Sequence, residues 1–203
     1  MRLVISCMDR RLNNYLKKNY EHSIIIRNAG ANINSLQKTL EKYKDIADEV
    51  VVLPHTDCGA MKVVYSSLVE GKKLTELVEN KLSSQFVGKQ FSSLSDLERL
   101  NLSIQKENAM KIFGNKVRAE LIDINKIDIL PTNQPYMVYL TNPSKPIELE
   151  SNIYVISADE DDIWDSLDIA FYGMRINKVK VNYNNSVVVD KIKSTYPFVT
   201  LLT

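Results

Sequence analysis

Short apolar segments alternate with helical patterns along the first part of the chain. The apolar segments cover residues 3–7, 23–26 and 49–53. The third is apolar at all but its first position, which is typical of a strand in a parallel sheet covered on both faces. Apolar residues with helical spacing follow each segment, around residues 12–16, 36–47 and 61–68. The alternation predicts an α/β fold with a mostly parallel sheet and flanking helices.

The pattern weakens after these elements. Residues 72–93 are polar and show no clear period. Ser95 to Glu98 form a capping-box sequence, which predicts the start of a helix that runs to Phe113 and ends at Gly114. Residues 117–129 indicate a strand, a turn and a second strand.

The character of the chain changes after Pro131. A segment rich in Pro, Tyr and Asn is followed by strand patterns at 153–156 and 179–181 and a helical pattern at 163–172. We therefore divide the chain into a domain of residues 1–130 and a C-terminal α/β extension of residues 131–203. So small an extension has little core of its own and is expected to pack on the first domain or on a partner subunit. An independent domain joined by the proline-rich segment is the alternative.

An acidic run, Asp159 to Asp162, precedes the predicted helix of the extension. Such a run is compatible with a metal site. It is also typical of a helix N-terminus, where the helix dipole favours carboxylates, and we prefer that interpretation.

The bulk composition narrows the function classes. The 203 residues are 44% apolar and 25% charged with a formal net charge of +1, which lacks the basic excess of a nucleic-acid-binding surface. No apolar run reaches the roughly 18 residues needed to span a bilayer. With no signal-peptide pattern at Met1, the expected location is the cytoplasm.

The candidate chemistry lies in two short segments, Cys7-Met8-Asp9-Arg10-Arg11 and His55-Thr56-Asp57-Cys58-Gly59. They hold both cysteines of the chain and one of its two histidines. Two thiolates and an imidazole make three ligands of a tetrahedral zinc site whose fourth position stays open, the catalytic type. The alternatives without a metal are two buried free cysteines or one disulfide.

The positions of these residues in the predicted sheet favour the metal site. Cys7 ends the first strand and His55 follows the third, and ligands of α/β sheets bind at the carboxyl ends of strands where the strand order switches. If these two strands are neighbours, all three candidate ligands converge there. Asp9 and Arg11, two and four residues after the first thiol, would lie beside the metal. The bland interpretation of that pair is a loop salt bridge of little consequence.

In these segments the chain resembles the β-class carbonic anhydrases, in their prokaryotic, archaeal-type branch. The resemblance rests on three motifs in matching order and spacing over residues 1–130: Cys7-x-Asp9-x-Arg11, Arg27-Asn28-Ala29-Gly30 and His55-x-x-Cys58-Gly59. It implies zinc held by Cys7, His55 and Cys58, with an Asp9–Arg11 dyad as the catalytic pair. It also implies hydration of carbon dioxide to bicarbonate, a zinc lyase activity, and assembly as a homodimer or higher homo-oligomer.

Some features depart from that family. The N-terminal helical arm and its substrate-binding glutamine are absent, and residues 131–203 have no recognised counterpart. Two alternatives therefore stay open beside carbon dioxide hydration. One is hydrolysis of carbonyl sulfide or carbon disulfide at the same site, and the other is a non-catalytic zinc-binding scaffold. Small-molecule substrates, and neither nucleic acid nor membrane, are the expected partners. His22, the other histidine, is interpreted as a surface residue.

Overall fold

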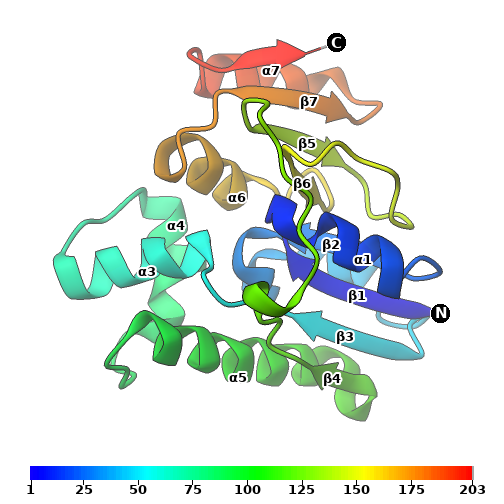
Figure 1. The fold of residues 1–203 in the computed structure, drawn as a ribbon, viewed down its shortest axis with the longest axis vertical. Coiled ribbons are helices and arrows are strands. Elements are labelled where there is room, and N and C mark those ends of the chain that lie inside the picture. The colour runs from blue at the N-terminus through cyan, green and yellow to red at the C-terminus, as the bar shows by residue number, and fades with distance from the viewer. Residues whose placement is uncertain (203) are drawn as a thin grey trace.

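The computed structural model describes residues 1–202 as an α/β fold built on a single twisted sheet (Figure 1). Its strands are β1 (Arg2–Cys7), β2 (Ile24–Asn28), β3 (Glu49–Leu53), β4 (Val117–Ala119), β5 (Met137–Thr141), β6 (Ile153–Ser157), β7 (Lys178–Asn182) and β8 (Thr200–Leu202). The helices are α1 (Asn13–Asn19), α2 (Gln37–Glu41), α3 (Gly59–Glu70), α4 (Glu76–Lys81), α5 (Leu94–Phe113), α6 (Trp164–Asp168) and α7 (Ser186–Thr195). The predicted fold class is confirmed.

The sheet has the strand order β4-β3-β1-β2-β6-β5-β7-β8 and consists of two parallel halves. Neighbouring strands are parallel everywhere except between β2 and β6, where Arg27 lies opposite Ser157 in an antiparallel pair. The strands of the two halves therefore end at opposite edges of the sheet. Figure 1 shows β4 and β8 at the two ends of this sheet, with the antiparallel seam in the middle.

The seam joins residues 131–203 to the first part of the chain. Ile25 N–H donates to the carbonyl of Ser144 at 2.9 Å, and Val155 N–H donates to the carbonyl of Met8 at 3.0 Å. The Ser157 hydroxyl donates to the carbonyl of Ile25 at 2.7 Å. The expectation that the extension packs on the first domain is thus confirmed, and it does so by continuing the same sheet.

The central strands follow directly from their sequences. β1 is buried from Leu3 to Cys7, and β3 is buried from Val50 to Leu53, because neighbouring strands and helices cover both faces. Pro54, which has no N–H for the ladder, follows β3 and ends it. Gly71 ends α3 with a left-handed φ of 68°, as its position after the apolar period predicted.

Two sequence predictions are wrong in detail, and a third segment holds a helix for which no prediction was made. The helix α5 begins two residues earlier than predicted, because Ser93 rather than Ser95 is the cap and its hydroxyl accepts from Asp96 N–H. Residues 120–129 form no second strand after β4; they include the short 3₁₀ turn Ile124–Lys126. The polar segment 72–93 holds α4, whose first turn is capped by Thr75.

The C-terminal half of the sheet region, residues 131–202, also contains elements that the sequence pattern did not predict. These are β5, α7 and β8. The predicted helix at 163–172 divides into α6 and a π-helical turn, η7 (Ile169–Gly173). The acidic run lies directly before α6, as predicted, but no side chain caps that helix. The Asp162 carboxylate accepts from the N–H and hydroxyl of Thr39, both at 2.6 Å, and Asp159 pairs with Lys42. The run instead ties the C-terminal half to α2.

Candidate metal centre

Cys7, His55 and Cys58 come together at the carboxyl edge of the first half-sheet. β1 and β3 are parallel neighbours, with Ser6 opposite Leu53, so Cys7 at the end of β1 lies beside the segment that follows β3. Cys58 is the N-cap residue directly before α3. One ligand atom of each residue lies within 4.8 Å of the other two, and all three residues are buried. The predicted convergence of the three side chains is confirmed.

His55 presents one ring nitrogen to this cluster. Its Nδ1 lies 2.7 Å from the carbonyl of Thr56, which fixes the proton there, and its buried Nε2 has no hydrogen-bond partner. The segment after β4 holds this loop in place: Thr56 N–H donates to the carbonyl of Ile122 at 2.9 Å, and Ile124 N–H donates to the Thr56 hydroxyl at 2.9 Å. A buried, unprotonated Nε2 is the form that ligates metal.

The donor set fits a soft or borderline divalent metal. Both cysteines are free thiols, which excludes the disulfide alternative for this structure. The Cys58 thiol as a hydrogen-bond donor lowers the pKa of Cys7 well below its ordinary range, and His55 acts in the same direction against the effect of burial. The cluster therefore favours a thiolate at Cys7. Two sulfurs and one imidazole nitrogen match the ligands of a Cys₂His zinc site.

Asp9 lies next to the cluster, at the turn after β1. Its Oδ2 is 3.7 Å from His55 Nε2, and its side chain is 7% exposed. Arg11 binds it in a forked arrangement, with Nε 3.0 Å from Oδ1 and Nη2 2.8 Å from Oδ2, and the Arg11 backbone N–H donates to Oδ1 at 2.9 Å. Burial alone would raise the pKa of Asp9, but these hydrogen bonds and the nearby charges lower it below the ordinary value. Asp9 is therefore held as a carboxylate.

Arg11 also contacts the second motif. Its Nη1 donates to Asp57 Oδ2 at 2.7 Å and its Nη2 donates to the carbonyl of Asp57 at 2.7 Å. Lys62 in α3 also binds Asp57, with an ion pair of 2.6 Å between Nζ and Oδ1. Asp57 has a left-handed φ of 53°, which a non-glycine residue adopts only at a cost. The sequence analysis assigned Asp57 no role, since the partner it binds lies in the other motif.

Arg27, from the Arg27-Asn28-Ala29-Gly30 motif, holds the turn between Cys7 and Asp9 through hydrogen bonds to its backbone. Its Nε donates to the carbonyl of Cys7 at 3.0 Å, and its Nη2 donates to the carbonyl of Asp9 at 2.7 Å. Burial lowers its pKa to about 10. Because it binds the backbone carbonyls of both Cys7 and Asp9, Arg27 fixes the direction in which the chain leaves β1.

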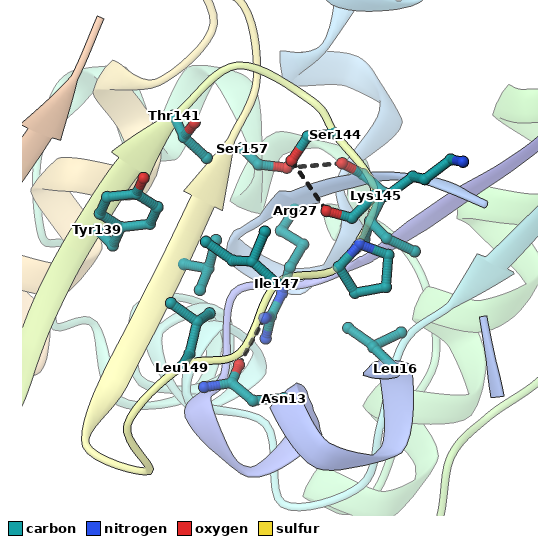
Figure 2. Close-up of a pocket in the computed structure, with 13 residues that line it drawn as sticks. Asn13, Leu16, Arg27, Tyr139, Thr141, Ser144, Lys145, Ile147, Leu149 and Ser157 are labelled. Atoms are coloured by element: carbon teal, nitrogen blue, oxygen red, sulfur yellow. Dashed lines mark hydrogen bonds between the residues drawn. The ribbon is translucent and has the colours of Figure 1, made fainter. Parts of the chain in front are cut away.

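The same guanidinium lines a small cavity of about 40 Å³ at the seam between the half-sheets. Figure 2 shows Arg27 reaching Asn13 beside Ile147 and Leu149, under the loop that follows β5. None of Cys7, Asp9, His55 and Cys58 lines it. This cavity is therefore separate from the candidate metal ligands.

Residues of the C-terminal half approach the site, which the sequence analysis did not foresee. Ser166 in α6 accepts a hydrogen bond from Ala29 N–H in the loop after β2 at 2.9 Å. Burial, followed by the charge of Asp9, raises the pKa of Tyr154 in β6. No local pattern marks these two residues, because each faces its partner only after β6 has paired with β2.

The remaining sequence predictions can be placed briefly. His22 is exposed and lies 3.1 Å from the Glu21 carboxylate. It is not part of the cluster of Cys7, His55 and Cys58. Within residues 1–202, no second group of three metal-ligating side chains is found, so the acidic run at 159–162 forms none. No helix in this part of the chain has the length and apolar character needed to cross a membrane.

Comparison with known proteins adds no assignment. No protein-family model matches the chain, and no curated protein matches its sequence. The class defined by fold and site is therefore an α/β protein with a buried Cys-His-Cys cluster that could hold a metal ion.

Proposed function

We propose that this chain is a zinc-dependent enzyme of the β-carbonic-anhydrase type that hydrates carbon dioxide to bicarbonate and a proton. The observation that carries the proposal is the Asp9–Arg11 pair beside the Cys7–His55–Cys58 cluster. A structural zinc site needs only its ligands. Here a carboxylate is also held ionised, 3.7 Å from the imidazole nitrogen that faces the cluster.

A zinc ion bound by Cys7, His55 and Cys58 would lower the pKa of a bound water toward neutrality and so supply hydroxide near pH 7. The residues of the chain have separate parts in that chemistry. Asp9 offers an acceptor oxygen beside the cluster, and as a carboxylate it can only accept a hydrogen bond, whereas the protonated acid would also present a donor. Arg11 keeps it so and fixes both of its oxygens with a fork of charge-assisted bonds.

Metal analysis followed by stopped-flow hydration of carbon dioxide tests the proposal. We expect about one zinc per chain and a rate that rises from about pH 6 to about pH 9. Asp9→Asn should retain zinc and lose most of the turnover. The same assay with carbonyl sulfide and carbon disulfide compares the other two substrates. Protein that carries zinc but hydrates none of the three would refute the enzyme and support a non-catalytic scaffold.

A further inference from the structure

A buried serine in α6, Ser166, is linked to the candidate ligand Cys7 through two successive backbone N–H groups. Ser166 has no exposed surface, and its hydroxyl accepts the N–H of Ala29 at 2.9 Å. The next backbone N–H, that of Gly30, donates to Cys7 Sγ at 3.4 Å. The same short turn, η2 (Ala29–Ala31), thus touches α6 on one side and the metal cluster on the other.

This turn has a backbone conformation that needs external support. Gly30 has a left-handed φ of 73°, and Ala31, which carries a Cβ, has a left-handed φ of 53°. The carbonyl of Gly30 accepts from the Asn101 side chain of α5 at 3.0 Å. Ser166 and Asn101 therefore hold the two peptide units on either side of the Ala29–Gly30 peptide, whose N–H donates to the sulfur.

The helix that carries Ser166 is itself fixed on the same loop. Asp165 accepts from the Ser35 hydroxyl at 2.5 Å, and Asp162, just before α6, accepts from Thr39. With the contact to Ala29, α6 and the residues before it are bound at three successive points from the turn after β2 to α2. Asp162, Asp165 and Ser166 are all buried. The position of the Ser166 hydroxyl is therefore set by these contacts with the segment from Ala29 to Thr39.

We propose that Ser166 is a positioning residue of the metal centre, which makes residues 131–203 part of that centre. Its hydroxyl holds the Asn28–Ala29 peptide, and this fixes the adjoining Ala29–Gly30 peptide so that Gly30 N–H remains on Cys7 Sγ. That hydrogen bond stabilises the thiolate and lowers the energy of its lone pairs. The inference rests on the metal binding proposed above. Groups that hydrogen-bond directly to metal ligands change affinity about 10- to 100-fold when they are removed, and Ser166 acts one step further from the ligand, so the lower end of this range is expected.

The experiment compares Ser166→Ala with a matched control, Ser157→Ala, in the full-length protein. Ser157 is a buried serine of the same half whose hydroxyl binds the carbonyl of Ile25 and does not touch the turn. Zinc affinity is measured by competition with a chelator. The sulfur-to-metal charge-transfer band is measured on protein loaded with Co²⁺. Ser166→Ala should bind zinc about tenfold more weakly. Its band should move to longer wavelength, because a thiolate that loses a donor gives up its electrons more easily.

The outcomes separate this inference from the proposed function. Ser157→Ala should match the wild type in both measurements, and Ser166→Thr, which keeps the hydroxyl, should restore the wild-type band. If Ser166→Ala does not fold, Ser166→Cys replaces it, since sulfur is similar in shape and a weak acceptor. A wild type that binds zinc, together with a Ser166 variant of unchanged band and affinity, overturns the inference alone. A wild type that binds no metal overturns the proposed function as well.

Discussion

Arg11 and Asp57 join the two sequence motifs of the candidate site through a pair of hydrogen bonds, each 2.7 Å long. One bond goes to the carboxylate of Asp57 and the other to its carbonyl, so the guanidinium is fixed both to a side chain and to the backbone next to Cys58. The remaining donors of Arg11 serve Asp9. Arg11 is therefore shared by two carboxylates, of which only Asp9 lies against the cluster.

This relationship leads to the first expectation, for Asp57→Asn. The amide keeps an oxygen for Arg11 but loses the charge, so Arg11 is held less firmly and Asp9 is oriented less well. We expect about a tenfold loss of kcat with zinc content unchanged, as for other groups that act through a neighbour. Glu120→Gln, which changes an acidic residue outside the site, is the control. A rate equal to the wild type would show that Asp57 does not support the dyad.

A double-mutant cycle examines the dyad itself. Asp9→Asn should lower turnover about 100-fold or more, because the amide can present a donor where the carboxylate accepts. Arg11→Ala should act through Asp9, so the double variant should be hardly slower than the slower single variant. Zinc content measured on each variant separates loss of chemistry from loss of metal. Losses that add in the logarithm of the rate would contradict a functional pair.

The two histidines give a direct comparison for metal binding. His55→Ala removes the buried Nε2 of the cluster, whereas His22→Ala changes a side chain that is 86% exposed. We expect the first to lose most of the zinc and to unfold at lower temperature, because metal binding is coupled to folding, and the second to change neither. Cys58→Ser should behave like His55→Ala. Full zinc occupancy in either cluster variant, by elemental analysis, would refute the site.

Asp165 gives the protein a dependence of stability on pH. Burial raises its pKa to about 6 from an ordinary value of 3.8. The folded state therefore binds more protons than the unfolded state between these values, and the contribution of Asp165 to stability falls as pH rises through this window, by roughly 3 kcal/mol in all. Asp165→Asn should remove that loss. The stability difference between variant and wild type, from urea unfolding, should thus rise from about pH 4 to about pH 7.

Asp161→Asn serves as the control for this measurement, because Asp161 is an exposed neighbour in the same acidic run. Its stability difference from the wild type should stay nearly constant over the same range. If the stability difference for Asp165→Asn is also constant with pH, burial does not raise the pKa of Asp165.

Truncation after Leu130 examines the role of the C-terminal half. Removing β6 would leave the edge of β2 unpaired and would expose the buried Ile25 and Ile26, which is a condition for aggregation. We expect an aggregated or markedly destabilised protein, compared by size-exclusion chromatography and thermal unfolding. A soluble, zinc-bound fragment with an unchanged melting temperature would show that residues 131–203 are an independent addition.

The sequence by itself determined the local parts of this protein. Apolar runs that ended at Cys7 and before His55 identified the two strands that carry the cluster, because a buried parallel strand needs apolar residues on both faces. The chemistry of thiols and imidazole identified Cys7, His55 and Cys58 as a group. The positions of Asp9 and Arg11 in the same short segment as Cys7 made their pairing predictable, since neighbours along a turn need no distant element to meet.

Tertiary structure alone decided the contacts between segments that lie far apart in the chain. Ser166 and Ala29 are separated by 137 positions, and nothing near Ser166 distinguishes it from any other small residue on a buried helix. The antiparallel pairing of β2 with β6 could not be predicted from the sequence either, because each of these strands could equally well form the edge of a separate sheet. Such contacts depend on how all apolar faces are buried together. Local periodicity reports which face of a segment is buried, and it does not report the partner against which that face packs.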